Sequence, residues 1–295
     1  MGRMCYMNGE FIPESELKIS AYDLSVAQGV AAFEMTRSFN GVHFKLRSHL
    51  HRLLASCRAL SLSFPWTLDE VEGWCLETAA RNDHGPGEEH RLLIVVSPGC
   101  APMYRELGGV IPHPFLYIAD FPLRYTVAGF SKYFTEGVHC VTSQIQQVPD
   151  TCLPSSAKHR SRLHFHLAQM QAPAGTWPLM LDQAGYYTEA PGANLCGVIR
   201  GQVIGNSLES LPGISMQTAI DLSGGRIGQF QQIPAADELW LTGTPFCAIS
   251  VASLDGKPIG DGKPGPVYKA MMEKWNNLVG LNIAEQIIRW DEEAS

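Results

Sequence analysis

The chain has no CxxC pair and no run of lysine and arginine. Its eight cysteines are scattered without close cysteine–histidine spacing, so neither a disulfide framework nor a zinc site is expected. A net charge of -7 without a basic run argues against general nucleic-acid binding. No metal ion and no nucleic acid are therefore predicted as partners.

Long apolar segments, repeats and low-complexity tracts are also absent. Nothing approaches the roughly 18 apolar residues that span a bilayer, and the N-terminus has no apolar signal core. We therefore expect no membrane association and a cytoplasmic location. The 295 residues, 45% hydrophobic and 17% charged, are sufficient for a large core divided between two domains.

The first third of the sequence predicts hairpins and helices. Two Asn-Gly pairs, at residues 8–9 and 40–41, separate alternating apolar segments, which is a strong hairpin signal because both residues accept positive φ. Leucines at helical spacing predict a helix from about Ser48. A capping box of Thr67 with Glu70 predicts that another helix follows.

Composition also suggests where the domains meet. Residues 121–134 mix proline, glycine and polar residues, and we expect them to connect the domains. This predicts an N-terminal α+β domain over residues 1–120 and a C-terminal domain over residues 135–295. In the second domain we expect strands at 137–142, 179–181, 197–204 and 238–241, and helices from about Ser156, Ser215 and Pro266.

Four short motifs in the sequence can carry chemistry. Lys158 supplies an amine that can form an imine, and Glu189 offers a carboxylate in a separate turn. The turn at Gly213 leads into a helix at Ile214 and Ser215, where free N–H groups favour an anion such as phosphate. The fourth motif, Thr242-Gly-Thr244, places two hydroxyls at the end of a predicted strand. Each motif alone also has a structural explanation, as an exposed charge, a helix cap or a turn.

In their order along the chain, these motifs resemble those of the fold-type IV pyridoxal phosphate enzymes, the family of branched-chain and D-amino acid aminotransferases and aminodeoxychorismate lyase. The matching segments are Asn8-Gly9, Phe33-Glu34 with Arg37, His49–Leu53, Lys158, Thr188-Glu189 with Asn194, Gly213–Ser215 and Thr242–Thr244. The resemblance implies a two-domain α/β (α+β) fold with pyridoxal 5'-phosphate (PLP) at the domain interface. It also implies a homodimer, because active sites of this family usually borrow residues from the partner subunit.

The resemblance assigns roles to the matching residues. Lys158 would bind the cofactor covalently and then move the proton at the substrate α-carbon, and Glu189 would pair with the pyridinium nitrogen. Arg52 would contact the phosphate. The cofactor-binding residues that it implies are Arg52, Lys158, Glu189, Asn194, Ile214, Ser215 and Thr244.

The departures from the family lie around the substrate. Leu163 stands where aminotransferases of the family carry a tyrosine, and Arg162-Leu163 looks like aminodeoxychorismate lyase. Met216 replaces a usual arginine. Pro245 has no N–H with which to bind a substrate carboxylate, as the corresponding residue of the branched-chain enzymes does.

Other cations must then bind the substrate's anion. Arg37, Arg105 and Arg162 are the candidates, although each has a simpler explanation as a surface or structural arginine. His159, Arg162 and His166 would share one face of the helix expected after Lys158, and a solvated face is the simpler explanation for them.

The resemblance favours transamination between an amino acid, branched-chain-like or D-configured, and a 2-oxo acid such as 2-oxoglutarate. The first alternative is elimination from aminodeoxychorismate to give 4-aminobenzoate and pyruvate. The second is a PLP-binding protein with little catalysis, against which the presence of both Lys158 and Glu189 argues.

Overall fold

The computed structural model describes residues 2–206, 209–229 and 236–294, which divide into two compact units. Unit 1 comprises Met1–Tyr125 and Ser156–Arg162, and unit 2 comprises Thr126–Ser155 and Leu163–Ser295. The segment that carries Lys158 thus packs with unit 1, although it follows the predicted connection in sequence. The domain limits at 1–120 and 135–295 stay a prediction.

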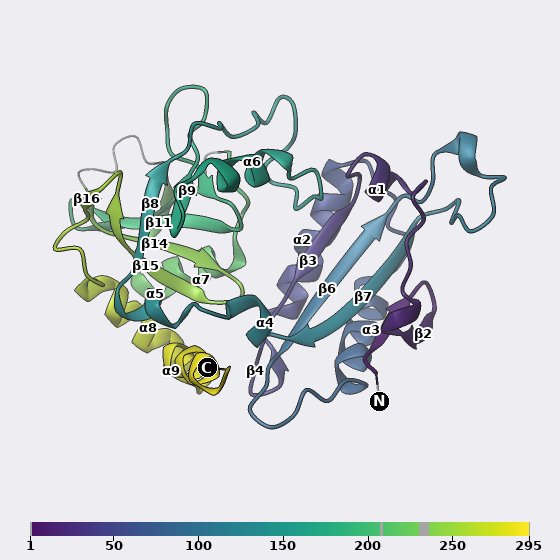
Figure 1. Ribbon diagram of the computed structural model, residues 1–295, viewed down its shortest axis with the longest axis horizontal. Helices are drawn as coiled ribbons and strands as arrows, with labels where there is room; N and C mark the ends of the chain where they lie inside the picture. Colours follow the sequence, from purple (N-terminus) through teal and green to yellow (C-terminus); the bar gives the residue numbers. More distant parts are fainter. Residues whose placement is uncertain (1, 207–208, 230–235, 295) are drawn as a thin grey trace. The chain divides into compact units, whose positions relative to one another are not determined.

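Unit 1 is built on a five-stranded antiparallel sheet in the order β2-β1-β7-β6-β3 (Figure 1). Its strands are β1 (Met4–Met7), β2 (Glu10–Pro13), β3 (Ala32–Met35), β6 (His90–Ser97) and β7 (Phe115–Pro122). A short hairpin consists of β4 (Ser38–Phe39) and β5 (Val42–His43). The helices are η1 (Glu14–Glu16), α1 (Leu24–Ala27), α2 (Leu46–Ala59), α3 (Leu68–Ala80) and η2 (Pro102–Tyr104), and α4 (Arg124–Val127) crosses the boundary between the units.

The two faces of this sheet differ because side chains alternate along each strand. On the helix face, Leu92, Ile94 and Val96 of β6 form one apolar core with Leu50 and Leu53 of α2 and with residues of α3. The opposite face, here called the Phe33 face, carries Phe33 and Val95 with Met35, Leu93 and Tyr117 packed against them. Because side chains on both faces of β6 are buried in these two cores, residues 92–96 of the strand are all apolar.

The local signals in unit 1 are confirmed. Asn8 and Gly9 join β1 to β2 with φ values of 50° and 109°, and Asn40 and Gly41 join β4 to β5 with 50° and 76°. The capping box of Thr67 and Glu70 begins α3. The leucine-rich helix α2 begins at Leu46, two residues before the predicted start.

Unit 2 contains a nine-stranded sheet whose main path is β13-β12-β11-β14-β15-β8-β9 (Figure 1). Its strands are β8 (Val138–Thr142), β9 (Thr176–Leu179), β10 (Glu189–Ala190), β11 (Ala193–Ile199), β12 (Gln202–Asn206), β13 (Arg226–Gly228), β14 (Ala236–Gly243), β15 (Cys247–Leu254) and β16 (Lys257–Pro258). Its helices are α5 (Ser131–Thr135), α6 (Leu163–Gln171), α7 (Ile214–Ser223), α8 (Pro266–Val279) and α9 (Ile283–Ala294). Among the described residues, no helix combines the length and apolar character needed to cross a bilayer.

Three of the predicted elements are wrong. The strand expected at 179–181 lies earlier, as β9, which ends at Leu179. The segment 197–204 is not one strand but a hairpin of β11 and β12, because Arg200 and Gly201 both take positive φ and reverse the chain. The helix expected from Ser156 begins only at Leu163. His159 lies before it and forms a β-bridge with Ala32.

That correction changes the surroundings of the residues after Lys158. His159 and Arg162 precede α6, and only His166 lies within it. The three side chains therefore do not share one helical face. The extended segment ends where α6 begins, at Leu163. This leucine is 68% exposed.

Candidate cofactor site

Lys158 is fixed to unit 1 through its backbone. Its N–H donates to Ser56 Oγ at 2.9 Å, and its carbonyl accepts from the N–H of Phe33 at 2.9 Å. The first bond comes from α2 and the second from β3. The ammonium Nζ lies 4.8 Å from the centroid of the Phe33 ring. The segment thus places an amine over the Phe33 face in a defined position.

Two further cations lie over the same aromatic ring. The guanidinium carbons of Arg160 and Arg162 are 4.3 and 5.8 Å from the centroid of Phe33. Ring faces attract cations, and the attraction increases when water is excluded. Arg162, one of the predicted substrate-binding residues, therefore lies in the same local environment as Lys158.

Arg37 and Arg91 form a second cationic group on the Phe33 face. Arg37 follows the end of β3 by two residues, and Arg91 of β6 precedes Leu93, the register partner of Met35, by two. The alternation of side chains therefore puts both arginines on the Phe33 face. Arg37 is 1% exposed; its Nε donates to the carbonyl of Ser38 at 3.2 Å, and its guanidinium lies 3.8 Å from the centroid of Phe39.

Arg91 differs from Arg37 in its hydrogen bonding. It is 5% exposed, yet its Nε and Nη1 have no hydrogen-bond partner among the described residues. Burial, followed by the charge of Arg37, lowers the pKa of Arg91 to about 9. Sequence reasoning missed this residue. The available signal was a single cation at the start of an otherwise apolar strand.

Arg52 lies on the helix face and pairs with Glu34. Its Nε and Nη2 donate to the two carboxylate oxygens at 2.6 and 2.9 Å, and His49 Nδ1 lies 2.8 Å from Oε2. Burial raises the pKa of Glu34, but Arg52 and His49 outweigh it and bring the pKa well below its ordinary value. The pair thus fixes the orientation of the Arg52 guanidinium on the helix face.

The remaining substrate candidate, Arg105, is exposed in the loop between β6 and β7. It is the C-cap residue of η2, and its N–H donates to the carbonyl of Pro102 at 3.4 Å. Its surroundings therefore differ from those of the buried Arg37 and Arg91.

In unit 2, Glu189 lies in a ring of N–H donors. Its carboxylate accepts from Asn194 Nδ2 at 3.2 Å, from the N–H of Leu211 at 3.3 Å and from Gln147 Nε2 at 3.4 Å. Glu189 and Asn194 are also register partners of β10 and β11. This arrangement fixes a buried anion at the start of the turn that leads to α7. Gln147 was missed because it is distant in sequence.

The N-terminus of α7 is shaped for an anion. Gly213 is its N-cap and has no side-chain cap, so the first N–H groups, those of Ile214 and Ser215, are not capped by a side chain. Asn194 Nδ2 also donates to the carbonyl of Leu211 at 2.8 Å, and any Cβ at Gly213 would overlap Asn194 Oδ1. Asn194 thus links the start of α7 to Glu189, and its predicted contact with the cofactor stays a prediction.

Thr244 lies in the three-residue turn between β14 and β15. Gly243 and Cys247 are register partners on either side of this turn. A Cβ at Gly243 would overlap the Phe246 ring, which explains the glycine between the two threonines. Thr242 is the register partner of Asn194. The β14–β15 turn therefore lies next to the start of β11, the strand that carries Asn194. Within this turn, Pro245 offers no N–H.

These motifs agree with a known family. The sequence profile described as "Amino-transferase class IV" matches residues 31–254, well over half of the chain. The chain belongs to this family. Class IV aminotransferases depend on PLP, so the expected cofactor is that of the family.

Related sequences give the same family with different substrates. A predicted branched-chain-amino-acid aminotransferase of Methanocaldococcus jannaschii is 27% identical over 290 residues, covering 92% of this chain and 95% of the relative. The branched-chain-amino-acid aminotransferase-like protein 1 of Arabidopsis thaliana is 28% identical over 93% of this chain, which spans only 50% of that relative. The D-alanine aminotransferase of Bacillus licheniformis is 24% identical, with 95% and 98% coverage.

Solved structures confirm the predicted fold. A branched-chain amino acid aminotransferase of T.th. with pyridoxamine 5'-phosphate superposes with a TM-score of 0.82 at 25% identity, over 95% of this chain and 94% of that one. That of Thermoproteus uzoniensis with norvaline gives a TM-score of 0.82 at 25% identity, over 98% of both chains. This class IV aminotransferase thus has the mixed α/β fold of the fold-type IV enzymes.

Proposed function

We propose that the protein transfers an amino group between an amino acid, branched-chain-like or D-configured, and a 2-oxo acid. The observation that carries this proposal is the amine of Lys158, held by two backbone hydrogen bonds over the Phe33 ring on the same sheet face as the buried Arg37 and Arg91. An amine for proton transfer and cations for a substrate anion are the two requirements of this reaction.

The donor set fits PLP. In unit 2, the N-terminus of α7 with Ser215 and Thr244 would suit a dianionic phosphate. In unit 1, Arg52 is the arginine that we propose for a phosphate contact. A protonated ring nitrogen needs an acid partner, and Glu189, oriented by Asn194, would be that partner. When bound, the cofactor accepts the electron pair left at the substrate α-carbon.

The protein's own residues would then divide the work. Lys158 Nζ would hold the cofactor covalently, and once released by the substrate it would take the proton from the α-carbon and return one. Its attachment to Ser56 and Phe33 limits the positions that the amine can reach, which favours a productive geometry. Leu163 gives no hydroxyl where the family's aminotransferases have a tyrosine.

Arg37 and Arg91 would bind a carboxylate of the substrate. Pro245 has no N–H to offer in the β14–β15 turn. Nε and Nη1 of Arg91, which have no hydrogen-bond partner among the described residues, could each donate to a carboxylate oxygen. Two adjacent buried cations favour an anion strongly, and a dicarboxylic 2-oxo acid such as 2-oxoglutarate is the acceptor that we propose. Arg162, over Phe33, is the additional candidate on this face, and Arg105 is the candidate in the exposed loop.

The test follows the visible absorption of the purified holoenzyme during addition of single L- and D-amino acids without any 2-oxo acid. Conversion of the cofactor to its pyridoxamine form supports transamination, and the amino acid that achieves it identifies the donor. Release of pyruvate from aminodeoxychorismate without that conversion would instead establish the lyase. A spectrum that responds to neither would favour the cofactor-binding protein.

The homodimer and the cytoplasmic location expected from the sequence stay predictions. Light scattering of the purified protein tests the homodimer.

A further inference from the structure

A second polar cluster lies in unit 1, on the helix face and therefore across the sheet from Arg37 and Arg91. Asp120 of β7 is fully buried, and its Oδ2 lies 3.0 Å from His84 Nε2 and 2.8 Å from His90 Nδ1. Asp120 is the register partner of Leu92. His90, two residues before Leu92, is therefore its diagonal neighbour on the same face.

The three side chains present a recognised set of metal ligands. Their ligand atoms all lie within 4.8 Å of one another. Two imidazole nitrogens and one carboxylate oxygen suit zinc and other first-row divalent ions, and three protein ligands leave a fourth position for water. With metal–ligand bonds of about 2.0–2.2 Å, tetrahedral ligands stand about 3.3–3.5 Å apart. The two nitrogen–oxygen distances at Asp120, 3.0 and 2.8 Å, would each have to lengthen by about 0.3–0.7 Å to reach that separation.

The hydrogen bonds of Asp120 are unevenly distributed. Both imidazoles approach Oδ2, whereas Oδ1 is buried and has no hydrogen-bond partner in the part of the chain that the structure describes. A buried carboxylate that only supports the fold is expected to satisfy both oxygens. A cation bound by Oδ2 and the two imidazole nitrogens would add a positive charge beside this incompletely paired carboxylate.

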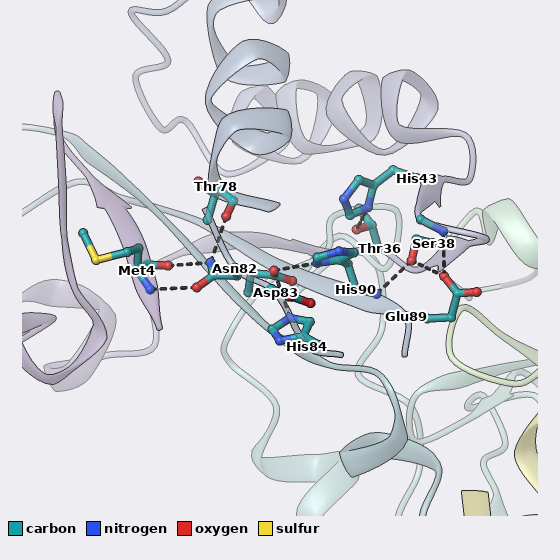
Figure 2. Close-up of polar contacts among 12 residues, drawn as sticks. Met4, Thr36, Ser38, His43, Thr78, Asn82, Asp83, His84, Glu89 and His90 are labelled. Carbon is teal, nitrogen blue, oxygen red and sulfur yellow. Dashed lines mark hydrogen bonds and ion pairs between the residues drawn. The ribbon is translucent and has the colours of Figure 1, made fainter. Parts of the chain in front are cut away.

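The backbone on the α3 side of the cluster is fixed by Asn82 (Figure 2). The Asn82 side chain accepts from the N–H of Met4 at 2.8 Å and donates to the carbonyls of Met4 and Thr78 at 2.9 and 2.8 Å. It therefore ties the segment that carries His84 to β1 and to the end of α3.

The β6 side is fixed by Glu89, as Figure 2 also shows. Ser38 Oγ donates to Glu89 Oε2 at 2.5 Å and accepts from the N–H of His90 at 2.8 Å, and the N–H of Asn40 donates to Glu89 Oε1 at 2.7 Å. Hydrogen bonds thus hold the backbone at His90 and close to His84, as a preorganised set of metal ligands requires.

A third histidine lies beside this group. The His43 ring centroid is 5.9 Å from that of His90, and Thr36 Oγ1 lies 3.3 Å from His43 Nδ1. Burial, followed by the charge of His90, lowers the pKa of His43 to about 4, so its imidazole is neutral near pH 7. No short spacing in the sequence indicates this cluster, because Asp120 comes from a neighbouring strand.

We propose that His84, His90 and Asp120 bind one divalent transition-metal ion of the zinc type. The ion would link the α3–β6 loop to β7 and stabilise unit 1. Its ligands face away from Arg37 and Arg91, so it has a structural role and takes no part in amino transfer. The proposal does not depend on the function proposed above.

The test uses the holoenzyme, first treated with a chelator and then dialysed against Zn²⁺. We expect one zinc per chain and a rise in melting temperature, since an ion that binds only the folded state stabilises it. His84→Gln and Asp120→Asn should each weaken zinc binding at least about tenfold. His51→Gln, which changes an exposed histidine of α2, is the matched control and should bind zinc as the wild type does.

Two results would overturn the proposal. One is a wild-type protein that binds no zinc, and the other is equal zinc affinity in the wild type and His84→Gln. If the variants fold poorly, the visible spectrum of the wild-type protein with Co²⁺ still decides. Bands of a four-coordinate ion with nitrogen and oxygen ligands support the site, and the spectrum of hydrated Co²⁺ contradicts it.

Discussion

Glu34 and Arg91, buried on opposite faces of the same five-stranded sheet, differ in how their charges are matched. Under the helices, Glu34 is matched by Arg52 and by the His49 imidazole within hydrogen-bond distance. On the Phe33 face, Nε and Nη1 of Arg91 have no hydrogen-bond partner among the described residues, and Nη2 donates to Met35 Sδ at 3.5 Å. We therefore expect the charge of Glu34 to support the fold and that of Arg91 to serve ligand binding.

The largest expected effect comes from Lys158 on the Phe33 face. Lys158→Ala should lower the rate of amino transfer at least about 10³-fold, because it removes both the covalent attachment and the proton carrier. Its folding stability should change little, since the hydrogen bonds to Ser56 and Phe33 come from the backbone of residue 158 and persist in the variant. The measurements are turnover with 2-oxoglutarate and urea unfolding.

Lys269→Ala, an exposed lysine of α8, serves as the control for Lys158 and should be fully active. Wild-type turnover by Lys158→Ala would remove the lysine from the mechanism. A stability loss as large as that of a core mutation would show that the amine, too, supports the fold.

On the helix face, Glu34→Gln should cost about 3–5 kcal/mol in the free energy of unfolding, because it leaves the buried guanidinium of Arg52 without a counter-charge. The low pKa of Glu34 gives the sign of the pH dependence. Its stabilisation is complete above the unfolded-state pKa of about 4.3 and is lost as the pH falls toward the lower folded-state pKa. Urea unfolding at pH 7 and below pH 4 should show the difference between wild type and variant shrinking with acid. A constant difference would mean that the charge of Glu34 is not what matters.

Arg91→Met should show the opposite relation between stability and function. Removing an unpaired buried cation should leave the free energy of unfolding unchanged or raise it by about 1–3 kcal/mol. The KM for a dicarboxylic 2-oxo acid should rise at least about 30-fold, with a smaller change in kcat. Measured together, the two quantities separate a binding arginine from a structural one. A destabilised variant with normal KM would contradict our interpretation of the Phe33 face.

Features that depend on neighbouring residues could be predicted from the sequence. The two Asn-Gly hairpins, the Thr67 capping box and the glycine turn before α7 each follow from backbone preferences over a few positions. Lys158 and Glu189 needed a family resemblance, because nothing within either segment distinguishes a catalytic lysine or glutamate from an ordinary one.

Features that depend on strand pairing could not be predicted in this way. Arg91 reaches Arg37 only through the β3–β6 register, and His90 reaches Asp120 only through the β6–β7 register. The helix expected after Ser156 was wrong for the same reason, since hydrogen bonds to Phe33 and Ser56 hold that segment extended. Long-range pairing overrode the local helical pattern.

The smallest expected effect tests whether burial, rather than pairing alone, explains the cost at Glu34. Glu77 and Arg81 of α3 form an i,i+4 ion pair at 2.5 Å, with side chains 48% and 44% exposed. Glu77→Gln should lower the free energy of unfolding by at most about 0.5 kcal/mol, because water screens both charges and the unpaired arginine stays solvated. Added salt should reduce this difference further, while that of Glu34→Gln persists. A similar cost at both sites in urea unfolding would mean that the pairing itself, and not its place beneath the helices, determines what a charge contributes to this fold.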